Sequence, residues 1–376
     1  MAHVVDRWKN AERRGKGKRW LARYTDPSGR ERSRAFDRKV DAERWLTNLE
    51  AEKLKGVYVD HTDRTTVGEY AWRWFEARPY RPASAKRIGS LIRVHIDGSR
   101  LGARRLVAVQ PSEVQAWVTE RSKVLAPQTL RQVTSLLRSI YASAVLDRLV
   151  GTSPVIRLQL PRFERERIVP LTVEQVRTLA ETMPARNRAM VITQAGLGLR
   201  VGELLALRVE DVDFLRRTVK VEGQITTSNE RSEPKTPRSR RTVPLPQVVA
   251  EALSEHLRAF PSGDDGSVFV TRLGVPHRHN TYGSVTFPAA VKRAKLPAGT
   301  TSHDLRHHYA SVLLAAGESV VAVAERLGHE DASLVLSTYG HLMPNSEDRT
   351  RHAVDAAWSS AYADGPETDQ TVQKAL

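Results

Sequence analysis

The sequence predicts an α+β fold that is mainly helical and is divided into several domains. Long stretches repeat apolar residues every three or four positions, the period of a helix with one buried face. Alternating apolar and polar residues, typical of strands, are confined to residues 20–36 and 218–245. These patterns predict a small N-terminal sheet with one helix, an all-helical domain, and a mostly helical third domain with a small antiparallel sheet. A length of 376 residues suits two or three such cores.

The composition is strongly basic, with 59 Lys and Arg against 43 Asp and Glu and a formal net charge of +16. Such a balance favours a polyanionic partner, either nucleic acid or an acidic membrane surface, although an Arg-rich coding bias alone would also raise the charge. No apolar run approaches the roughly 18 residues of a membrane span, and the basic start lacks the apolar stretch of a secretory signal. The absence of cysteine excludes disulfides, thiolate zinc sites and cysteine nucleophiles. We therefore expect a cytoplasmic, nucleoid-associated protein that does not bind membranes.

Residues 1–60 predict a module of their own. Residues 20–24 and 30–36 alternate apolar and polar side chains around an Asp-Pro-Ser-Gly turn, which predicts a hairpin. Apolar residues at helical spacing predict a helix from about Asp41. The hairpin is expected to have a basic face, which either binds DNA or only keeps the module soluble. Its basic residues are Lys16, Lys18, Arg19, Arg23, Arg30, Arg32 and Arg34.

Residues 66–153 predict an all-helical domain. One apolar stripe begins at Val67, and a longer one runs from Leu130 to Ala144. Pro111 is expected to begin a helix between them, because proline fits the first turn. Five basic residues on the predicted polar faces either contact phosphates or are solvated surface charges: Lys86, Arg87, Arg93, Arg131 and Arg138.

A proline-punctuated stretch separates this domain from the last one. Residues 154–170 have mixed charges and no apolar period, which predicts an interdomain linker. The last domain, 171–363, begins with Thr172 and Gln175 at capping-box spacing. Residues 218–225 predict a strand, and Lys235 lies in a proline-rich, flexible turn that leads into residues 241–245. The polar tail, 364–376, is expected to be disordered.

From Asp304 onward, apolar residues recur at helical spacing, which predicts a helix with a buried face formed by Leu305, Tyr309, Val312 and Leu313. Ser302 is the expected N-cap. This arrangement would place His303 and Arg306 at the start of the helix.

Two further short helices are predicted after it. The first spans 320–327 and stops at Gly328, a residue suited to the left-handed position after a helix, so that His329 lies in a turn. Tyr339 lies near the end of the second. Histidine, arginine and tyrosine side chains carried on helix ends can converge on one anionic group such as a phosphate.

This spacing resembles the catalytic C-terminus of the tyrosine recombinases, the phage integrase family. The resemblance is carried by HDLRH at 303–307, LGH at 327–329, and a tyrosine ten residues after that histidine, followed by Gly-His. Upstream, AGLGLRVGELLAL at 195–207 resembles the family's first arginine motif and places Arg200 at the matching position. Lys235 stands in a K-T-x-x-S-x-R-x-V-P-L pattern, like the mobile hairpin that carries the catalytic lysine of relatives. His308 departs from the family, in which a small or hydroxyl residue is more frequent.

Cleavage of a DNA phosphodiester needs a nucleophile, cations for the non-bridging oxygens, and a proton for the departing 5′ oxygen. Arg200 and Arg306 can make forked hydrogen bonds to the scissile phosphate and remain charged. Because these arginines stay charged, no metal ion or other cofactor is expected. A 3′-phosphotyrosyl link would preserve the bond energy, so religation is expected to need no ATP. The resemblance implies the other roles: Tyr339 as nucleophile, His303 as a group that helps to accept its proton, His329 as a donor to a phosphate oxygen, and Lys235 as the donor to the leaving group.

A metal site is the alternative for the histidines. His303 and His307 share a helix face at i and i+4, and His308 is adjacent. No third and fourth metal ligands lie near these histidines in the sequence, which disfavours a metal site. His307 is interpreted as a satisfied structural histidine, and Glu203 as a residue that orients Arg200 rather than as a ligand of Mg²⁺.

The resemblance implies a site-specific recombinase of the integrase type, which cleaves and rejoins DNA strands to integrate or excise a mobile element. It implies that residues 1–60 bind arm-type DNA sites, that 66–153 form a core-binding domain, and that 171–363 form the catalytic domain. The implied partners are double-stranded DNA attachment sites, further copies of the chain in a tetramer on DNA, and accessory DNA-bending or directionality factors. Two alternatives remain, a type IB topoisomerase and a non-catalytic DNA-binding regulator.

Overall fold

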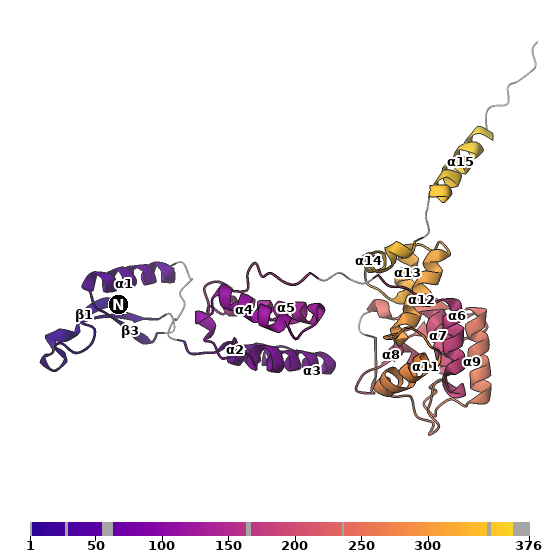
Figure 1. The fold of residues 1–376 in the computed structure, drawn as a ribbon, viewed down its shortest axis with the longest axis horizontal. Coiled ribbons are helices and arrows are strands. Elements are labelled where there is room, and N and C mark those ends of the chain that lie inside the picture. The colour runs from indigo at the N-terminus through magenta and orange to yellow at the C-terminus, as the bar shows by residue number, and fades with distance from the viewer. Residues whose placement is uncertain are drawn as a thin grey trace, which may run out of the picture. The chain divides into compact units, whose positions relative to one another are not determined.

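The computed structural model describes residues 2–26, 29–54, 63–162, 167–234, 237–343 and 347–363. The chain separates into two compact units, Met1–Arg165 and Glu166–Leu376 (Figure 1). Helices dominate both units and the strands form small antiparallel sheets, so the predicted fold class is confirmed. The finer division into 1–60, 66–153, 154–170 and 171–363 stays a prediction, and the predicted tail, 364–376, lies outside the described residues.

The first unit begins with a three-stranded antiparallel sheet in the order β1-β2-β3, covered on one face by a helix. The elements are β1 (His3–Asp6), β2 (Trp20–Thr25), β3 (Glu31–Phe36) and α1 (Lys39–Leu54). The hairpin and the helix were predicted, but β1 was not. With four residues, of which three are half-buried, β1 lacks the regular alternation that identifies a strand.

The register of the sheet corrects the prediction of a single basic face. Arg32 pairs with Tyr24, and Arg34 pairs with Ala22. Directly paired residues share a face, and Ala22 and Tyr24 belong to the core against α1. Arg23 pairs with Ser33 and therefore lies on the opposite face. The arginines of the hairpin are divided between the two faces.

The rest of the first unit is helical, as predicted. Its helices are α2 (Val67–Glu76), α3 (Pro82–Leu91), which continues into a π-helical stretch (Ile92–Asp97), α4 (Pro111–Ser122) and α5 (Pro127–Leu146). Pro111 stands in the first turn of α4. The predicted stripe of α5 is buried, with Leu130, Leu137 and Ala144 fully enclosed. These helices share one apolar core that is separate from the core under α1.

The second unit, from residue 166 onward, combines helices with two small sheets. Its helices are α6 (Val173–Thr182), α7 (Ala185–Leu197), α8 (Val201–Leu205), α9 (Gln247–Ala259), α10 (His279–Thr281), α11 (Phe287–Arg293), α12 (Ser302–Ala315), α13 (Val320–Leu327), α14 (Ser333–Tyr339) and α15 (Glu347–Ala363), and its strands are β4 (Val212–Asp213), β5 (Thr218–Val221), β6 (Gln224–Ile225), β7 (Arg231–Ser232) and β8 (Arg241–Pro244).

The predicted strand 218–225 is two strands. β5 is the central strand of the sheet β4-β5-β8, whereas β6 pairs with β7 in a separate ribbon. The break falls at Glu222 and Gly223, where glycine weakens a strand and permits a bend. The chain therefore leaves the β4-β5-β8 sheet after β5 and forms the separate β6-β7 ribbon. It returns as β8, which pairs with β5 and contacts α13, the helix that precedes His329.

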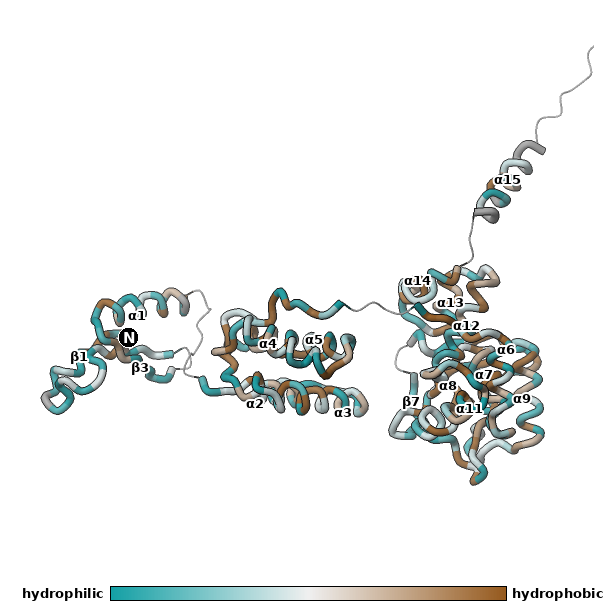
Figure 2. Tube along the Cα trace, in the orientation of Figure 1, coloured by the Kyte–Doolittle hydropathy of each residue, from teal (hydrophilic) through white to brown (hydrophobic). Residues whose placement is uncertain are grey.

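The core of this unit surrounds α7 and α12, whose apolar stretches lie in its interior (Figure 2). Leu305 and Tyr309 are buried as predicted, but Val312 is 44% exposed and Leu314 takes the buried place instead. The N-cap of α12 is Thr301 rather than Ser302, since Thr301 and Asp304 form the capping box. The helix therefore begins one residue earlier than the sequence indicated.

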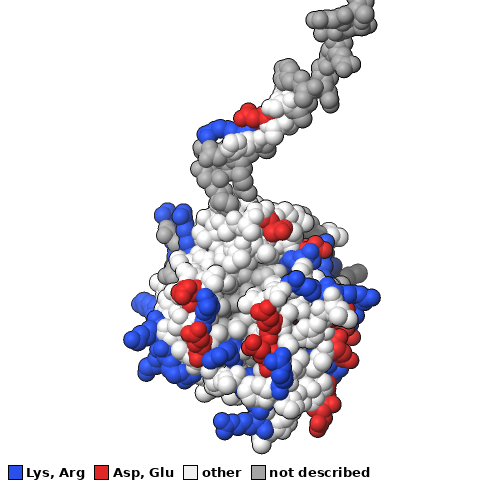
Figure 3. Space-filling model, turned by 90° about the vertical axis from the view of Figure 1, so that its right-hand side faces the viewer, with Lys and Arg blue, Asp and Glu red and all other residues white. Residues whose placement is uncertain are grey.

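The surface of the second unit is mixed in charge. On the side that carries α9, acidic and basic side chains are interspersed (Figure 3). On α15, the apolar residues Val354 and Trp358 are 51% and 63% exposed. Within the described ranges, no helix combines the length and the apolar character needed to cross a membrane.

Candidate active site

Helix ends position the side chains that the sequence singled out. His303 and Arg306 lie in the first turns of α12, and Arg200 is the N-cap of α8. His329 directly follows the glycine that ends α13, and Tyr339 is the last residue of α14. The structure brings these five residues into one cluster through the contacts of Arg306, Glu203 and His307. The sixth predicted residue, Lys235, lies outside the described residues.

Arg306 is the central cation of the cluster and is only 1% exposed. Its Nη1 donates to the Gly198 carbonyl at 2.7 Å, and its Nη2 donates to the Leu327 carbonyl at 2.6 Å. Nη2 also lies 2.9 Å from Nε2 of His329. Because a guanidinium group only donates, this nitrogen of His329 is the acceptor, and the ring proton is on Nδ1. Arg306 thus joins the loop before α8 to the loop after α13.

Two glycines shape these loops. Gly198 and Gly328 have φ angles of 64° and 65°, in the left-handed region that favours glycine. A Cβ at Gly198 would collide with the ring of Tyr309, and one at Gly328 would lie 3.1 Å from Nη1 of Arg241. The prediction that Gly328 ends its helix in this conformation is confirmed.

A buried carboxylate, Glu203, holds two arginines. Arg200 donates from Nη1 to Oε1 of Glu203 at 2.8 Å, and Arg241 donates to both carboxylate oxygens at 2.9 and 3.2 Å. Burial raises the pKa of Glu203, but Arg241, then Arg200 and Arg306, outweigh it and hold the pKa at about 2. Glu203 is therefore ionised and can orient Arg200, whose side chain is 38% exposed and thus accessible to a ligand.

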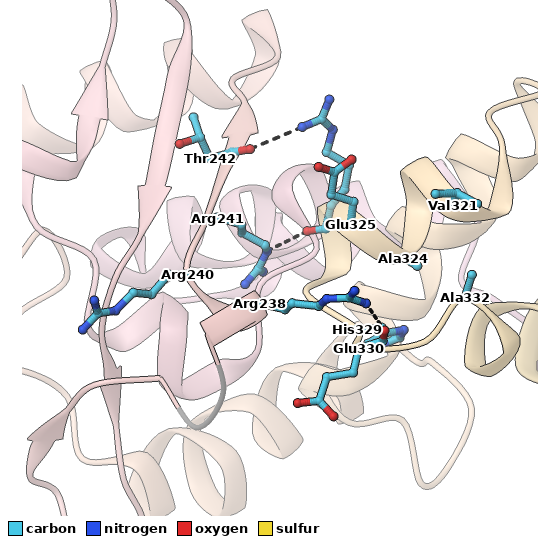
Figure 4. Close-up of a pocket in the computed structure, with 11 residues that line it drawn as sticks. Arg238, Arg240, Arg241, Thr242, Val321, Ala324, Glu325, His329, Glu330 and Ala332 are labelled. Atoms are coloured by element: carbon cyan, nitrogen blue, oxygen red, sulfur yellow. Dashed lines mark hydrogen bonds between the residues drawn. The ribbon is translucent and has the colours of Figure 1, made fainter.

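Arg241 was missed by the sequence analysis, although it stands in the same motif as Lys235. It is 5% exposed in its side chain, and its Nε donates to the Arg326 carbonyl at the end of α13 at 2.7 Å. Figure 4 shows it reaching from β8 toward α13, with Arg238 directed at the Glu330 carbonyl. These bonds tie β8 to the turn that holds His329. Arg238 and Arg241 line a cleft of about 510 Å³, together with Arg240, Arg326 and His329.

Tyr339 is 2% exposed, and its hydroxyl lies 2.6 Å from Nδ1 of His307. The ring of His303 meets the ring of His307 edge to face, with centroids 4.6 Å apart. Burial raises the pKa of Tyr339, although Arg306 opposes this rise. The phenol is therefore protonated near neutral pH and needs an acceptor before it can act as a nucleophile.

Burial, together with the nearby cations, keeps the histidines of the cluster neutral. Burial, then Arg306 and Arg200, lowers the pKa of His329 to about 4. Burial, His307 and Arg306 also lower the pKa of His303. Burial and Arg200 lower the pKa of Arg306 to about 9, which leaves it charged at neutral pH. The guanidinium groups of Arg200, Arg241 and Arg306 outnumber the buried carboxylate that lies among them, Glu203, so this part of the cluster attracts an anion.

The histidines of α12 do not gather around a common point that would suit a metal ion. His308 is buried and directs Nδ1 at the Leu171 carbonyl, 2.7 Å away. Within the part of the chain that the structure describes, no three His, Cys, Asp or Glu side chains group closely enough to hold a metal ion.

The basic residues predicted to contact DNA in the first unit are largely engaged within the protein. Arg19 pairs with Asp6 at 2.9 Å, Arg32 with Asp26 at 3.2 Å, Arg23 with Glu31 at 3.6 Å, and Lys18 with Asp37 at 3.3 Å, while Arg34 lies over the rings of Phe36 and Trp45.

The remaining predicted contact residues lie on the surface. Lys16, Arg30 and Lys86 are exposed. Arg87 donates to the Gln132 side chain, and Arg131 donates to the Pro161 carbonyl, both at 3.2 Å. Surface pairs of this kind are weak enough to exchange for phosphate contacts, so DNA contact by the basic residues of the first unit stays a prediction.

Comparison with known proteins decides the family. A model of the phage integrase family matches residues 169–346, and one of the phage integrase N-terminal domain matches 11–55. Tyrosine recombinase XerC of Lactobacillus delbrueckii subsp. bulgaricus is 30% identical over 233 residues, which cover 59% of this chain and 75% of that protein. The chain belongs to the phage integrase family of tyrosine recombinases. A putative prophage phiRv2 integrase of Mycobacterium tuberculosis is 29% identical over 332 residues, 85% of this tyrosine recombinase and 88% of the relative.

A solved structure shows the same fold. The Tn1549 transposon integrase, in complex with a circular intermediate DNA, superposes with a TM-score of 0.69 and 22% identity, covering 78% of this tyrosine recombinase and 99% of that chain. The fold predicted for a tyrosine recombinase, mainly helical with small antiparallel sheets, is therefore shared over most of the chain.

Proposed function

We propose that this tyrosine recombinase is an integrase that cleaves and rejoins DNA at specific sites through a 3′-phosphotyrosyl intermediate, to integrate or excise a mobile element. The observation that supports this function most directly is the cluster itself. A buried tyrosine, Tyr339, lies beside Arg306, and Arg306 contacts His329 and the loop that carries Arg200. The cluster thus offers a nucleophile next to cations suited to a phosphodiester.

The catalytic roles combine what the family resemblance implies with the cluster described above. The hydroxyl oxygen of Tyr339 attacks phosphorus, the bond to the 5′ oxygen breaks, and the 3′ side of the strand stays on the protein. Arg200 and Arg306 stabilise the charge on the non-bridging oxygens, a contribution of about 3 kcal/mol for each aimed donor. His329 donates a hydrogen bond to the same phosphate, His303 assists the proton transfer, and Lys235 protonates the 5′ oxygen. Attack by the 5′ hydroxyl of another strand reverses these steps.

The partners follow from the reaction. The substrate is a double-stranded DNA attachment site, as the DNA named with the Tn1549 integrase suggests by analogy. Exchange of all four strands of two duplexes consumes four tyrosines, and each chain supplies one Tyr339, so the active assembly is a tetramer. Residues 1–60 bind arm-type sites, 66–153 the core site, and 171–363 perform the chemistry. Accessory DNA-bending or directionality factors complete the complex, which acts in the cytoplasm on the nucleoid.

Strand cleavage is expected to continue in excess chelator and without nucleotide. Guanidinium groups supply the positive charge at the phosphate, a role that metal ions fill in other nucleases. A covalent-adduct assay in the presence of a chelator tests this. Abolition of the adduct, with recovery on addition of Mg²⁺, would contradict the proposed mechanism.

The decisive experiment traps the covalent intermediate. The protein is incubated with duplexes that cover the DNA flanking its encoding element, each nicked so that the short cleaved fragment diffuses away. A protein–DNA adduct that survives denaturation is expected for the wild type. Tyr339→Phe should bind the same DNA and form no adduct, because it lacks only the attacking oxygen.

The outcomes separate the candidate functions. An adduct formed by Tyr339→Phe would remove Tyr339 from the mechanism. Wild-type relaxation of supercoiled plasmids without regard to sequence would indicate a type IB topoisomerase instead. Binding without any adduct in the wild type would indicate a DNA-binding regulator. Peptide mapping of the adduct and sequencing of its DNA identify the nucleophile and the site together.

A further inference from the structure

His307 has no role in the function proposed above, yet it makes the closest contact with the nucleophile. Its Nδ1 lies 2.6 Å from the Tyr339 hydroxyl, and the two rings are tilted at 62° with centroids 5.5 Å apart. His307 sits one turn after His303 on α12, whereas Tyr339 ends α14. Among the residues that the structure describes, His307 is the one whose side chain hydrogen-bonds this hydroxyl.

The neighbours of Tyr339 leave His307 as the group placed to accept a proton. Arg306 cannot accept one, and its donors are directed at Gly198, Leu327 and His329. His329 already accepts from Arg306 through Nε2. His303 contacts His307 edge to face, on the ring rather than on the hydroxyl of Tyr339.

The charged and titratable groups around His307 favour its neutral form. Three of them lie on its own helix, namely His303, Asp304 and Arg306, and Tyr339 faces it from α14. Burial lowers the pKa of His307, Asp304 opposes this, and Arg306 adds to it. A neutral imidazole that receives a hydrogen bond on Nδ1 holds its own proton on Nε2, so Nδ1 has a lone pair directed at the hydroxyl.

We propose that His307 is a catalytic residue that orients the Tyr339 hydroxyl and takes its proton when the oxygen attacks phosphorus. This inference rests on the proposed function. The O–H bond of Tyr339 breaks as an N–H bond forms on Nδ1 of His307. The oxygen forms a bond to phosphorus, and the bond from phosphorus to the 5′ oxygen breaks, with a proton from Lys235. On religation, the His307 imidazolium returns its proton to the tyrosine oxygen. His303 then assists this proton transfer through its contact with the ring of His307.

The test is single-turnover cleavage of the nicked duplex by His307→Asn, His307→Gln and His307→Ala, with His352→Gln on α15 as the matched control. Asn can accept a hydrogen bond near the position of Nδ1 but cannot take the proton. Loss of general-base catalysis is expected to slow cleavage at pH 7 by roughly 100-fold or more. DNA binding and thermal melting should match the wild type, and the control should cleave at the wild-type rate.

Two readouts separate proton transfer from a structural role. The rate of His307→Ala should rise steadily with pH as the phenolate forms, and added imidazole should accelerate it. A duplex with sulfur in place of the 5′ bridging oxygen has a leaving group that needs no acid, so it should not restore the rate of His307 variants. If this duplex restores the rate, His307 acts as the acid and the proposal is overturned.

The failure of this inference is distinct from the failure of the proposed function. Wild-type protein that forms no adduct would refute the function itself. An adduct that forms in His307→Asn at the wild-type rate, with an unchanged pH profile, would overturn only the role of His307. Should His307→Ala fail to fold, the Asn and Gln variants test the same proton transfer, since both keep a polar side chain of similar length at the position.

Discussion

The cations around Tyr339 and those of the N-terminal sheet are organised in opposite ways. Arg306 is 1% exposed and the side chain of Arg241 is 5% exposed, and both bind loop carbonyls or one buried carboxylate. The arginines of the sheet lie near the surface, where Arg23 pairs with Glu31 across the hairpin and Arg34 lies over aromatic rings. Removing a buried donor leaves its partners unpaired, whereas a surface pair exchanges readily with water. The burial and the hydrogen-bond partners of a cation, rather than the number of cations, decide how much its removal affects stability and activity.

The largest effect is expected at Arg306. Arg306→Gln should lower the cleavage rate by roughly 100- to 1,000-fold, since it removes an aimed cation. It should also lower the melting temperature, because the carbonyls of Gly198 and Leu327 lose their donor. The same change at the surface, Arg34→Gln, serves as the control and should alter neither quantity strongly. Equal losses in both variants would break the contrast between buried and surface cations.

The next effect concerns Glu203 and depends on pH. Its pKa of about 2 lies below the ordinary 4.5, so its ion pairs stabilise the folded state fully above pH 4.5. This contribution is lost as the pH falls from 4.5 toward 2, and amounts to on the order of 3 kcal/mol. Glu203→Gln should be destabilised by roughly that amount at pH 7. The difference between the two proteins should shrink in acid, as measured by denaturant unfolding from pH 7 to pH 3. A difference that stays constant would show that Glu203 does not act through its charge.

Removal of residues 1–60 should change DNA occupancy rather than chemistry. Tethering a second binding module raises avidity by roughly 10²–10⁴-fold when the DNA between its sites can bend. The shortened protein should therefore cleave the crossover site at an unchanged rate but lose integration on substrates with long flanking arms. Footprints of both proteins on one long attachment site test this. If both protect the same region, the module only solubilises the chain.

The smallest effect is expected at single surface arginines of the sheet. Arg23→Gln should reduce the slope of log affinity against log salt by about 0.9 if the side chain leaves Glu31 for a phosphate. Binding measured across a salt series gives this slope. An unchanged slope would assign Arg23 to the fold of the hairpin alone.

Motif spacing predicted where most residues of the candidate site lie, because the distance between two residues along a helix fixes their relative positions. His303, Arg306, His329 and Tyr339 were all expected at helix ends, and the structure places them there. The sequence could not show that His307 meets Tyr339, since this contact depends on how α14 packs beside α12. The bond from Arg241 to Glu203 likewise joins elements 38 residues apart. Tertiary packing, which no local period encodes, decides both contacts.

The N-terminal sheet shows the same limit in another form. Alternation along residues 30–36 indicates that Arg32 and Arg34 share a face, but it does not indicate which face the helix covers. That choice depends on the packing of Tyr24, in β2, against Trp45, in α1, whose ring centroids lie 5.3 Å apart. The short strand β1 was missed because pairing with β2, rather than its own pattern, makes it a strand.

The hydrogen bond from Arg306 to His329 makes the latter ring a spectroscopic reporter of the substrate. In the free protein one ring nitrogen is protonated and the other is a bare acceptor, so the two ¹⁵N resonances of His329 should lie far apart. A phosphate beside the ring raises its pKa and favours protonation of both nitrogens. The two resonances should then converge, and the donor of Arg306 that His329 had occupied is released toward the phosphate. Isotope-labelled histidine would thus record the arrival of DNA before any strand is cut.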